Sequence, residues 1–316
     1  EARQALAGLT SVPKCSGTVV PPKILNRLHP MVQSIKGKGK GKSNNNSKGS
    51  GGGKSRGKGK DQEAPEKFDD KQGVWENARE QIGLRLIGEL SSATGGPAWE
   101  YPVMDDSRRC FVGYLRCPFS REDTSAFFAE IRDGTNWKQP LTPAGIAIPR
   151  KTAWMTAQGC TCTYRYGQIE VEANNYPPWM IDLMDRTMPF MGLHSRKDWP
   201  DSCNLNLYDD GGMSVGWHSD DERLFQGKFR DIRILSLSLG VTRRFELRAN
   251  WPEEGETPQR HLTLGNGDLC TMEGMVQKHY QHRVPKEGNI QGPRINLTWR
   301  WVVRHTPQCP SGRTRG

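Results

Sequence analysis

The first residues with an evident chemical use are a histidine and an aspartate two positions apart, His218 and Asp220. In an extended chain, side chains at i and i+2 project to the same side. A neutral imidazole and a carboxylate placed in this way can bind a divalent metal ion. A distant second histidine would complete the two-histidine, one-carboxylate set of non-haem Fe(II) enzymes. Alone the motif is weak, because it also occurs by chance in surface loops.

The sequence pattern does not decide which histidine would be the second metal ligand. Four candidates follow in the sequence: His261, His279, His282 and His305. His282 lies shortly before the last predicted strand, and His279 is its nearest rival. The two cannot occupy the same coordination position.

The last predicted strand, within residues 294–303, has two chemically different faces. Apolar side chains alternate with Arg294, Asn296, Thr298 and Arg300. A solvent-facing strand could show the same pattern, but arginine is also the preferred partner of a carboxylate. Asn206 and Tyr208 form a similar i, i+2 pair that could hold a carboxylate or keto group.

The elements that must position these residues are mostly short alternating strands. They are CNLNLY, RILSLSLG, RRFELR, RHLTL, GDLCTM, QHRVP and RINLTWRWVV. Turns rich in Gly, Asp and Asn separate them, which is typical of a sandwich or a jelly roll. A further strand is predicted at 111–115, and strand-like alternation begins near 160. Helices are predicted over 75–90, from a Ser120 cap to Gly134, and over 178–191, packing outside one sheet.

The positive charge is concentrated in one short segment. The net charge is +10, and residues 36–60 alone hold eight Lys, one Arg and no acid. Gly, Ser and Lys offer nothing to bury, so this segment is predicted to be disordered. It could be a solvated linker, a cationic arm that holds nucleic-acid phosphates, or both.

The cysteines give little sign of a metal site. They stand at positions 15, 110, 117, 160, 162, 203, 270 and 309. No pair has the CxxC spacing, which argues against a zinc ribbon or a zinc-structural protein. We expect reduced thiols of an intracellular protein, with Cys160 and Cys162 on one face of a strand.

Membrane spans are not expected, because no run of about 18 apolar residues exists. The sequence begins at Glu1, so an N-terminal targeting segment could be missing. A nuclear or cytoplasmic monomer is the expectation.

Together, these motifs resemble the AlkB family of Fe(II)- and 2-oxoglutarate-dependent dioxygenases. NxY, HxD, the strand series, HRVP and RxNxTxR follow one another in order over 95 residues. The matching segments are NLY, WHSDDE, SLSLG, MEG, QHRVP and RINLTWR. The resemblance covers about 108–304. It is closest to the eukaryotic members that repair N-alkylated bases in DNA or RNA.

The resemblance implies a fold and a division of the chain. The fold would be α+β, a double-stranded β-helix (jelly-roll) core with flanking N-terminal helices, preceded by a disordered basic segment. The expected parts are a poorly ordered segment over 1–35, a disordered linker over 36–74, a helical lead-in over 75–107, the dioxygenase domain over 108–306 and a flexible tail over 307–316.

The resemblance also implies roles for individual residues. The Fe(II) ligands and catalytic centre would be His218, Asp220 and His282. The residues binding 2-oxoglutarate would be Asn206, Tyr208, Arg294, Asn296 and Arg300. The residues facing the substrate would be Trp154, Tyr164, Tyr166, Asp221, Glu222 and Arg150.

The implied reaction is oxidative demethylation of 1-methyladenine and 3-methylcytosine in DNA or RNA, with Fe(II), 2-oxoglutarate and O2. Formaldehyde and succinate would be released. Single-stranded nucleic acid is favoured, because residues 140–148 lack the aromatic wedge of duplex-reading relatives, although Ile146 could serve instead. Two alternatives remain: a dioxygenase acting on a protein or another non-nucleic substrate, and a nucleic-acid-binding module without catalysis.

Overall fold

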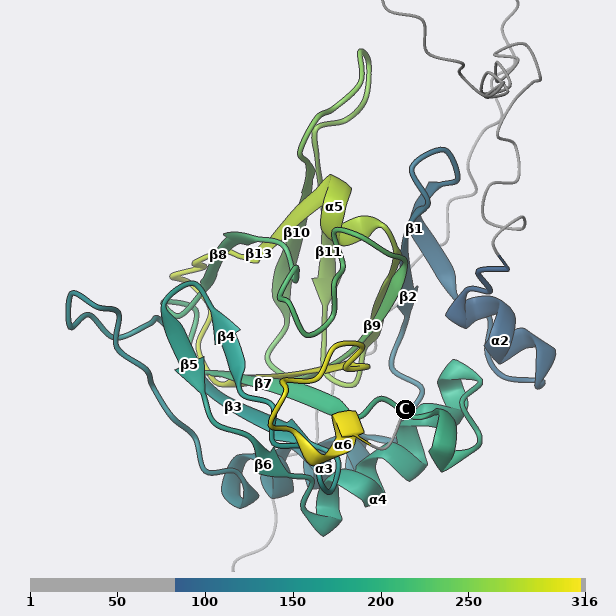
Figure 1. The fold of residues 1–316 in the computed structure, drawn as a ribbon. Helices are drawn as coiled ribbons and strands as arrows, with labels where there is room; N and C mark the ends of the chain where they lie inside the picture. Colours follow the sequence, from purple (N-terminus) through teal and green to yellow (C-terminus); the bar gives the residue numbers. More distant parts are fainter. Residues whose placement is uncertain (1–82, 314–316) are drawn as a thin grey trace, which may run out of the picture. The chain divides into compact units, whose positions relative to one another are not determined.

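Two facing β-sheets form the body of the protein in a computed structural model (Figure 1). The structure describes residues 83–313, and the predictions for residues 1–82 lie outside this range. No helix in the described range is both long and apolar enough to cross a membrane.

The larger sheet has eight strands and is mixed. In spatial order these are β1 (Glu100–Asp105), β2 (Cys110–Leu115), β12 (Leu269–Gly274), β9 (Ile232–Gly240), β14 (Arg294–Arg300), β7 (Ser202–Tyr208), β3 (Lys151–Thr156) and β6 (Asn174–Asn175). All neighbours are antiparallel except β3 and β6, which are parallel.

The smaller sheet has four antiparallel strands, and a separate hairpin stands beside it. The sheet order is β11 (Gln259–Leu264), β10 (Arg243–Ala249), β13 (Tyr280–Val284) and β8 (Val215–His218). The hairpin pairs β4 (Tyr164–Tyr166) with β5 (Ile169–Val171). The two-sheet architecture agrees with the predicted class, and the strands predicted from alternation are present.

Helices are short and few in the described part of the chain. They are α2 (Ile87–Ala93), α3 (Arg121–Gly134), α4 (Pro178–Thr187), α5 (Val276–His279) and α6 (Pro310–Arg313), with 3₁₀ turns η1 (Met188–Met191) and η2 (Arg196–Asp198). As predicted, α3 begins after Ser120, whose hydroxyl accepts the Asp123 amide at 3.0 Å, and ends at Gly134.

The central strand β14 explains how the layers form. Ile295, Leu297 and Trp299 are fully buried and join the same apolar cluster as residues of α3 and α4. Because side chains alternate across a strand, the polar residues of β14 turn towards the opposite sheet. The alternation in the sequence of β14 therefore determines two features together: the apolar core between the large sheet and the helices, and the polar surface that faces the smaller sheet.

Several predictions differ from the structure. Of the helix expected over 75–90, residues 75–82 lie outside the described range, and in the remainder a helix begins at Ile87, because Gly83 has a positive φ of 66° and Leu86 is extended. It also runs on to Ala93, into the predicted break. Cys160 and Cys162 lie in an irregular segment before β4, where the Cys160 amide closes a turn on the Ala157 carbonyl.

The segment from residue 307 was expected to be a flexible tail, and the structure describes it as far as residue 313. It contains the short helix α6, and Cys309, just before this helix, is fully buried.

Candidate metal centre and active site

Two neighbouring strands of the smaller sheet bring the candidate metal ligands together. His218 ends β8 and stands opposite His282 on β13, with ring centroids 4.2 Å apart. Asp220 follows β8 and is buried. Its carboxylate oxygens lie 3.7 Å from Nε2 of His218 and 3.8 Å from Nε2 of His282. These spacings suit three ligands of one ion better than direct hydrogen bonds.

Protonation states in this group favour metal binding. Burial, followed by repulsion from His218, lowers the pKa of His282 to about 3, so its imidazole is neutral. Burial raises the pKa of Asp220, but Arg300 and the two histidines outweigh it, so the net shift is downward and the group is a carboxylate. Nδ1 of His218 lies 2.8 Å from the Gly216 carbonyl, which leaves Nε2 as the free lone pair.

One cavity of about 540 Å³ opens on this group. Its wall includes most of the residues predicted to bind 2-oxoglutarate, namely Asn206, Tyr208, Asn296 and Arg300. These come from β7 and β14, which are adjacent and in register, Asn206 opposite Asn296 and Tyr208 opposite Arg294. The structure thus gathers residues about 90 positions apart in the sequence at one wall.

Arg294 is buried with unused hydrogen-bonding capacity. Its Nη2 donates to Ser238 Oγ at 2.8 Å and to Asn296 Oδ1 at 3.1 Å. Nε and Nη1 have no hydrogen-bond partner among residues 83–313. A fully buried guanidinium with free donors calls for an anion, and a carboxylate matches its fork. The residues present therefore fit a dicarboxylate such as 2-oxoglutarate.

Arg300, at the other end of β14, has acidic partners already. It donates to Glu222 Oε2 at 3.1 Å and lies 3.6 Å from Asp220. The Tyr164 hydroxyl donates to the other oxygen of Glu222. Burial raises the pKa of Glu222 to about 7, even though Arg300 acts in the opposite direction. These three side chains link the metal group to the β4–β5 hairpin.

The candidate substrate residues divide into three kinds. Arg150, Tyr164, Asp221 and Glu222 line the cavity, and Asp221 also forms an ion pair with Lys228. Trp154 is fully buried and does not line the cavity. Its ring stacks on Tyr164 at 4.9 Å, so it supports that ring from behind instead of touching a base. The side chain of Tyr166 lies outside the described residues.

Arg150 also has a partner within the site. Its Nε donates to Asn206 Oδ1 at 2.9 Å, joining a candidate substrate residue to a candidate 2-oxoglutarate residue.

Several residues that contact the candidate site or the cavity wall were not singled out in the sequence. Ser236 and Ser238 of β9 hold Asn296 and Arg294 at 2.7 and 2.8 Å. Their alternation in SLSLG was a usable signal, since it places both hydroxyls on one face. Arg248 and Arg283 lie 4.4 and 4.5 Å from the Trp217 ring centroid, an approach between strands that no local pattern reveals.

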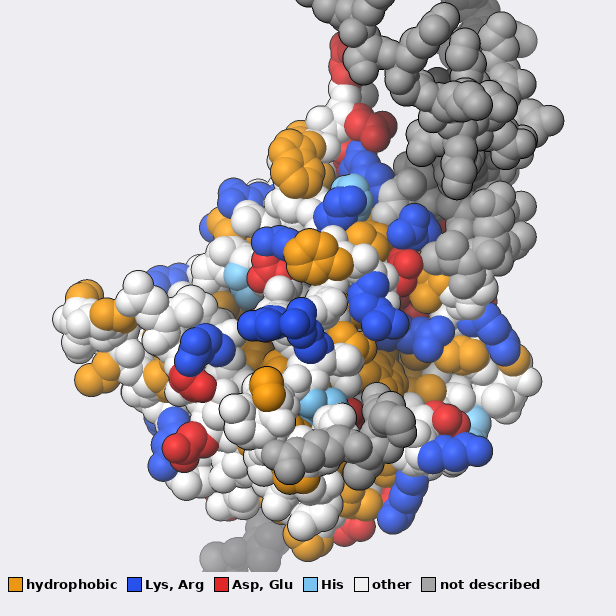
Figure 2. Space-filling view, in the orientation of Figure 1, with side chains coloured by type: hydrophobic (Ala, Val, Ile, Leu, Met, Phe, Trp, Pro, Cys, Tyr) orange, Lys and Arg blue, Asp and Glu red, His pale blue; other side chains and the backbone are white. Residues whose placement is uncertain are grey.

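A second hollow adjoins the cavity and shares Ser219 and Asp221 with it. It is also lined by Lys228, Trp251 and Lys278, and Trp251 is 70% exposed. The space-filling view shows Lys and Arg side chains spread over one face of the molecule (Figure 2). The hollow therefore combines cationic and aromatic groups beside the cavity mouth.

Comparison with known proteins places the chain. The model of the 2OG-Fe(II) oxygenase superfamily matches residues 109–300. The DNA oxidative demethylase ALKBH2 of Arabidopsis thaliana is 30% identical over 249 residues, 71% of this chain and 76% of that protein. The chain belongs to the AlkB family. Alpha-ketoglutarate-dependent dioxygenase alkB homolog 3 of Bos taurus is 37% identical over 178 residues, 54% of this chain and 55% of the relative. The human protein of the same name is 38% identical over 160 residues, which are 49% of this chain and 52% of the human protein.

AlkB-family proteins are Fe(II)- and 2-oxoglutarate-dependent dioxygenases, so Fe(II), 2-oxoglutarate and O2 are the cofactors expected here. The chain spans about half the length of the alkB homolog 3 proteins that it matches. The donor set agrees with this assignment: two imidazoles and a carboxylate suit Fe(II), and Arg294 suits the cosubstrate.

Proposed function

We propose that this protein removes methyl groups from N-alkylated bases of nucleic acid, with 1-methyladenine and 3-methylcytosine as substrates. The observation that carries the proposal is a single cavity shared by three groups of residues. The candidate metal ligands, four of the five candidate 2-oxoglutarate residues (all but Arg294) and an aromatic–acidic pair, Tyr164 and Glu222, line it. Relatives named DNA oxidative demethylase support the same substrate class.

The residues of this chain would hold and orient the reactants. His218, Asp220 and His282 would bind Fe(II), and Arg294, itself oriented by Ser238 and Asn296, would bind a carboxylate of 2-oxoglutarate. When bound, iron and 2-oxoglutarate supply the oxidising power that, with O2, turns the N-methyl group into formaldehyde while 2-oxoglutarate becomes succinate and CO2. No protein nucleophile is needed for this reaction.

The target base would have to leave its stack to reach the cavity. Tyr164 presents a flat ring there, and Asp221 and Glu222 supply carboxyl groups. These groups suit 1-methyladenine and 3-methylcytosine, which carry positive charge. Arg150 and Arg165, also at the cavity, could contact phosphates.

Single-stranded nucleic acid is the favoured partner. The neighbouring hollow offers Trp251 for stacking and Lys228 and Lys278 for phosphates, a combination common in single-strand binders. Residues 140–148 contain no aromatic side chain. They do expose Leu141 (60%) and Ile146 (66%), so insertion into a duplex by an aliphatic side chain is the alternative.

The test is mass spectrometry of oligonucleotides that carry one 1-methyladenine or 3-methylcytosine. DNA and RNA, single and double stranded, are incubated with Fe(II), 2-oxoglutarate, ascorbate and air. We expect loss of one methylene mass, strongest on single strands, and no loss without 2-oxoglutarate or with His218→Ala. His279→Ala is the matched control and should keep activity, because His279 is not part of the metal group.

Two other outcomes would reject the proposal. Succinate formation without any loss of methyl would indicate a dioxygenase that acts on another class of substrate. Absence of both, with oligonucleotide still bound, would indicate a binding module.

A further inference from the structure

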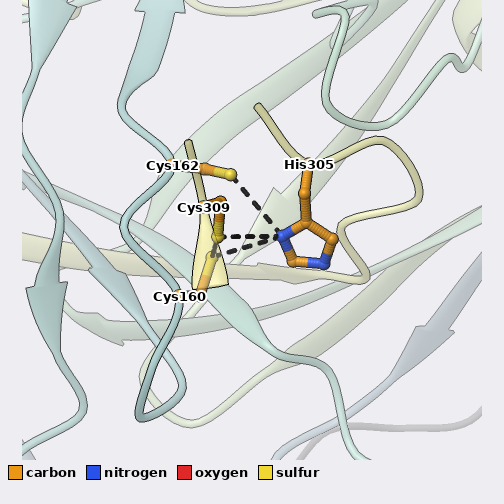
Figure 3. A group of neighbouring side chains, drawn as sticks. All are labelled: Cys160, Cys162, His305 and Cys309. Atoms are coloured by element: carbon orange, nitrogen blue, oxygen red, sulfur yellow. Dashed lines mark hydrogen bonds between the residues drawn. The ribbon is translucent and has the colours of Figure 1, made fainter. Parts of the chain in front are cut away.

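Four side chains that do not line the candidate iron cavity converge on one point. Cys160 and Cys162 come from the irregular segment between β3 and β4, and His305 and Cys309 come from the segment after β14 (Figure 3). Cys160, Cys162 and Cys309 are 3%, 0% and 0% exposed. Two chain segments separated by more than 140 positions thus meet through their sulfur and imidazole groups.

The distances within this group match those between ligands of one tetrahedral zinc ion. Nδ1 of His305 lies 3.7 Å from Sγ of Cys160, 3.5 Å from Sγ of Cys162 and 3.4 Å from Sγ of Cys309. Sγ of Cys160 and Cys309 are 3.8 Å apart. Zn–S bonds near 2.3 Å and Zn–N bonds near 2.05 Å at tetrahedral angles give about 3.6 Å for N···S and about 3.8 Å for S···S.

The backbone around the group favours thiolates. The Thr161 amide donates to Sγ of Cys309 at 3.4 Å, and the Thr306 amide donates to Sγ of Cys162 at 3.3 Å. Hydrogen bonds of this kind stabilise the charged sulfur and fix its direction, as those around metal ligands do.

A disulfide explains the arrangement less well. Cys160 and Cys309 would have to approach from 3.8 Å to about 2.05 Å, and Cys162 and His305 would be left without a role. Hydrogen-bonded thiols alone would bring three S–H groups to one imidazole nitrogen, whose single lone pair can accept only one of them.

We propose that Cys160, Cys162, Cys309 and Nδ1 of His305 bind a structural Zn²⁺ ion. Four protein ligands close the tetrahedron, so no position remains for water or substrate. Three thiolates also favour zinc over Fe(II), which suits the histidine–carboxylate group instead. The two metal sites would therefore differ in ligand type, and each would select its own ion.

The zinc ion would fasten the end of the chain to the base of the β4–β5 hairpin. The Cys162 carbonyl accepts the indole N–H of Trp154 at 2.8 Å, and Trp154 supports Tyr164 in the cavity wall. The site would thus position that wall indirectly, without touching the reacting atoms.

Metal analysis of the full chain tests the proposal. Plasma mass spectrometry should find one zinc per chain in the purified protein and in His218→Ala. That zinc should be lost in Cys309→Ser and Cys162→Ser and kept in Cys117→Ser, a control cysteine outside the group. Zinc that disappears with His218→Ala but survives Cys309→Ser would overturn the assignment, because it would belong to the other site.

Cobalt substitution tests the wild-type protein, so it does not depend on variants that fail to fold. Co²⁺ in a site of three sulfurs and one nitrogen should give strong tetrahedral absorption bands and a sulfur-to-cobalt charge-transfer band, both removed by one equivalent of Zn²⁺. Absence of these bands in reduced protein would reject the site. So would a Cys160–Cys309 disulfide, seen as two missing hydrogens in the linked peptides.

Discussion

At the scale of single residues, Arg294 says most about the cosubstrate. It is buried against Tyr208, with its guanidinium carbon 5.5 Å from the ring centroid, and only one of its three nitrogens has a hydrogen-bond partner in the described chain. Leaving donors unpaired inside a protein costs about 1–3 kcal/mol each, so the folded state carries a penalty that a bound carboxylate removes. The site is therefore prepared for an anion before the anion arrives.

Arg294→Lys should raise the KM for 2-oxoglutarate by about 10- to 100-fold, because lysine keeps the charge but cannot form the two-pronged pairing with a carboxylate. Succinate formation measured against 2-oxoglutarate concentration gives this value. Arg132→Lys, on the exposed side of α3, is the control and should leave KM unchanged. An unchanged KM in Arg294→Lys would show that the dicarboxylate binds elsewhere.

At the scale of elements, α3 covers the outer face of the large sheet and depends on a well-defined start. Phe127 and Ile131 are buried in the same cluster as the apolar side of β14. The Ser120 hydroxyl satisfies the Asp123 amide at the first turn, a group that would otherwise lack an acceptor. The cap therefore supports the packing beneath the catalytic sheet.

Ser120→Ala should lower the free energy of unfolding by about 1 kcal/mol, through loss of this cap. Ser125→Ala, in the same helix, removes a hydroxyl that donates only to the Arg121 carbonyl and should change stability far less. Urea unfolding of the two variants makes the comparison. Equal midpoints would contradict the assigned role of the cap.

A second pairing of elements depends on charge. Arg108, after β1, forms a two-pronged ion pair with Glu256 in the β10–β11 loop, at 3.1 and 2.8 Å. Hydrogen bonding from Arg108 lowers the pKa of Glu256 to about 2. A lowered pKa adds stability above the ordinary value of 4.5, and that stability disappears as pH falls towards 2.

Wild type should exceed Glu256→Gln in stability by about 1 kcal/mol at neutral pH, a modest value because solvent screens the pair. The difference should shrink as pH falls from 4.5 towards 2. Denaturant midpoints over a pH series measure it, with Glu254→Gln, exposed in the same loop, as control. A difference that stays constant with pH would exclude the ion pair as its source.

At the scale of the whole molecule, charge and chemistry are separated along the chain. Residues 36–60 carry nine positive charges out of a net +10, whereas the cavity lies within residues 150–300. The rest of the sequence is nearly neutral, so nucleic-acid affinity and catalysis should be separable by mutation.

Replacing the Lys and Arg residues of 36–60 by Ser should weaken oligonucleotide binding and flatten its salt dependence. The plot of log K against log salt has a negative slope, and each phosphate that is no longer neutralised makes this slope less steep by about 0.7 on single strands. Fluorescence anisotropy at several salt concentrations measures the slope, and turnover of saturating substrate should not change. An unaltered slope would show that phosphates are held by the folded part alone.

The sequence was most informative where one strand or helix carries the signal. Alternation located β7, β9, β10 and β14, and a capping serine located α3, because these patterns are local. β8 has only four residues, and its role depends on pairing with β13, so no local pattern reveals it.

The cysteines show where local sequence patterns fail to predict a site. Their expected role as ordinary thiols rested on the lack of a CxxC pair. The cysteines of the described residues are indeed free, but the structure groups Cys160 and Cys162 with His305 and Cys309 across more than 140 positions. His305, one of the four candidates for the second iron ligand, belongs to this group, and His282 takes the place beside Asp220. Only the tertiary fold distinguishes these histidines.

Because β14 has one apolar and one polar face, its register in the sheet determines both the packing of the core and the position of the candidate 2-oxoglutarate residues. A slip of one position would bring Ile295 into the cavity and put Arg294 into the apolar core. Tolerance to substitution along this strand should therefore have a period of two. Apolar exchanges of similar volume would be accepted at 295, 297 and 299, and almost nothing would be accepted at 294 and 296. A single inserted or deleted residue would disrupt both the buried apolar face and the polar cavity face of β14. The length of this strand is therefore fixed, whereas the loops on either side of it can vary in length.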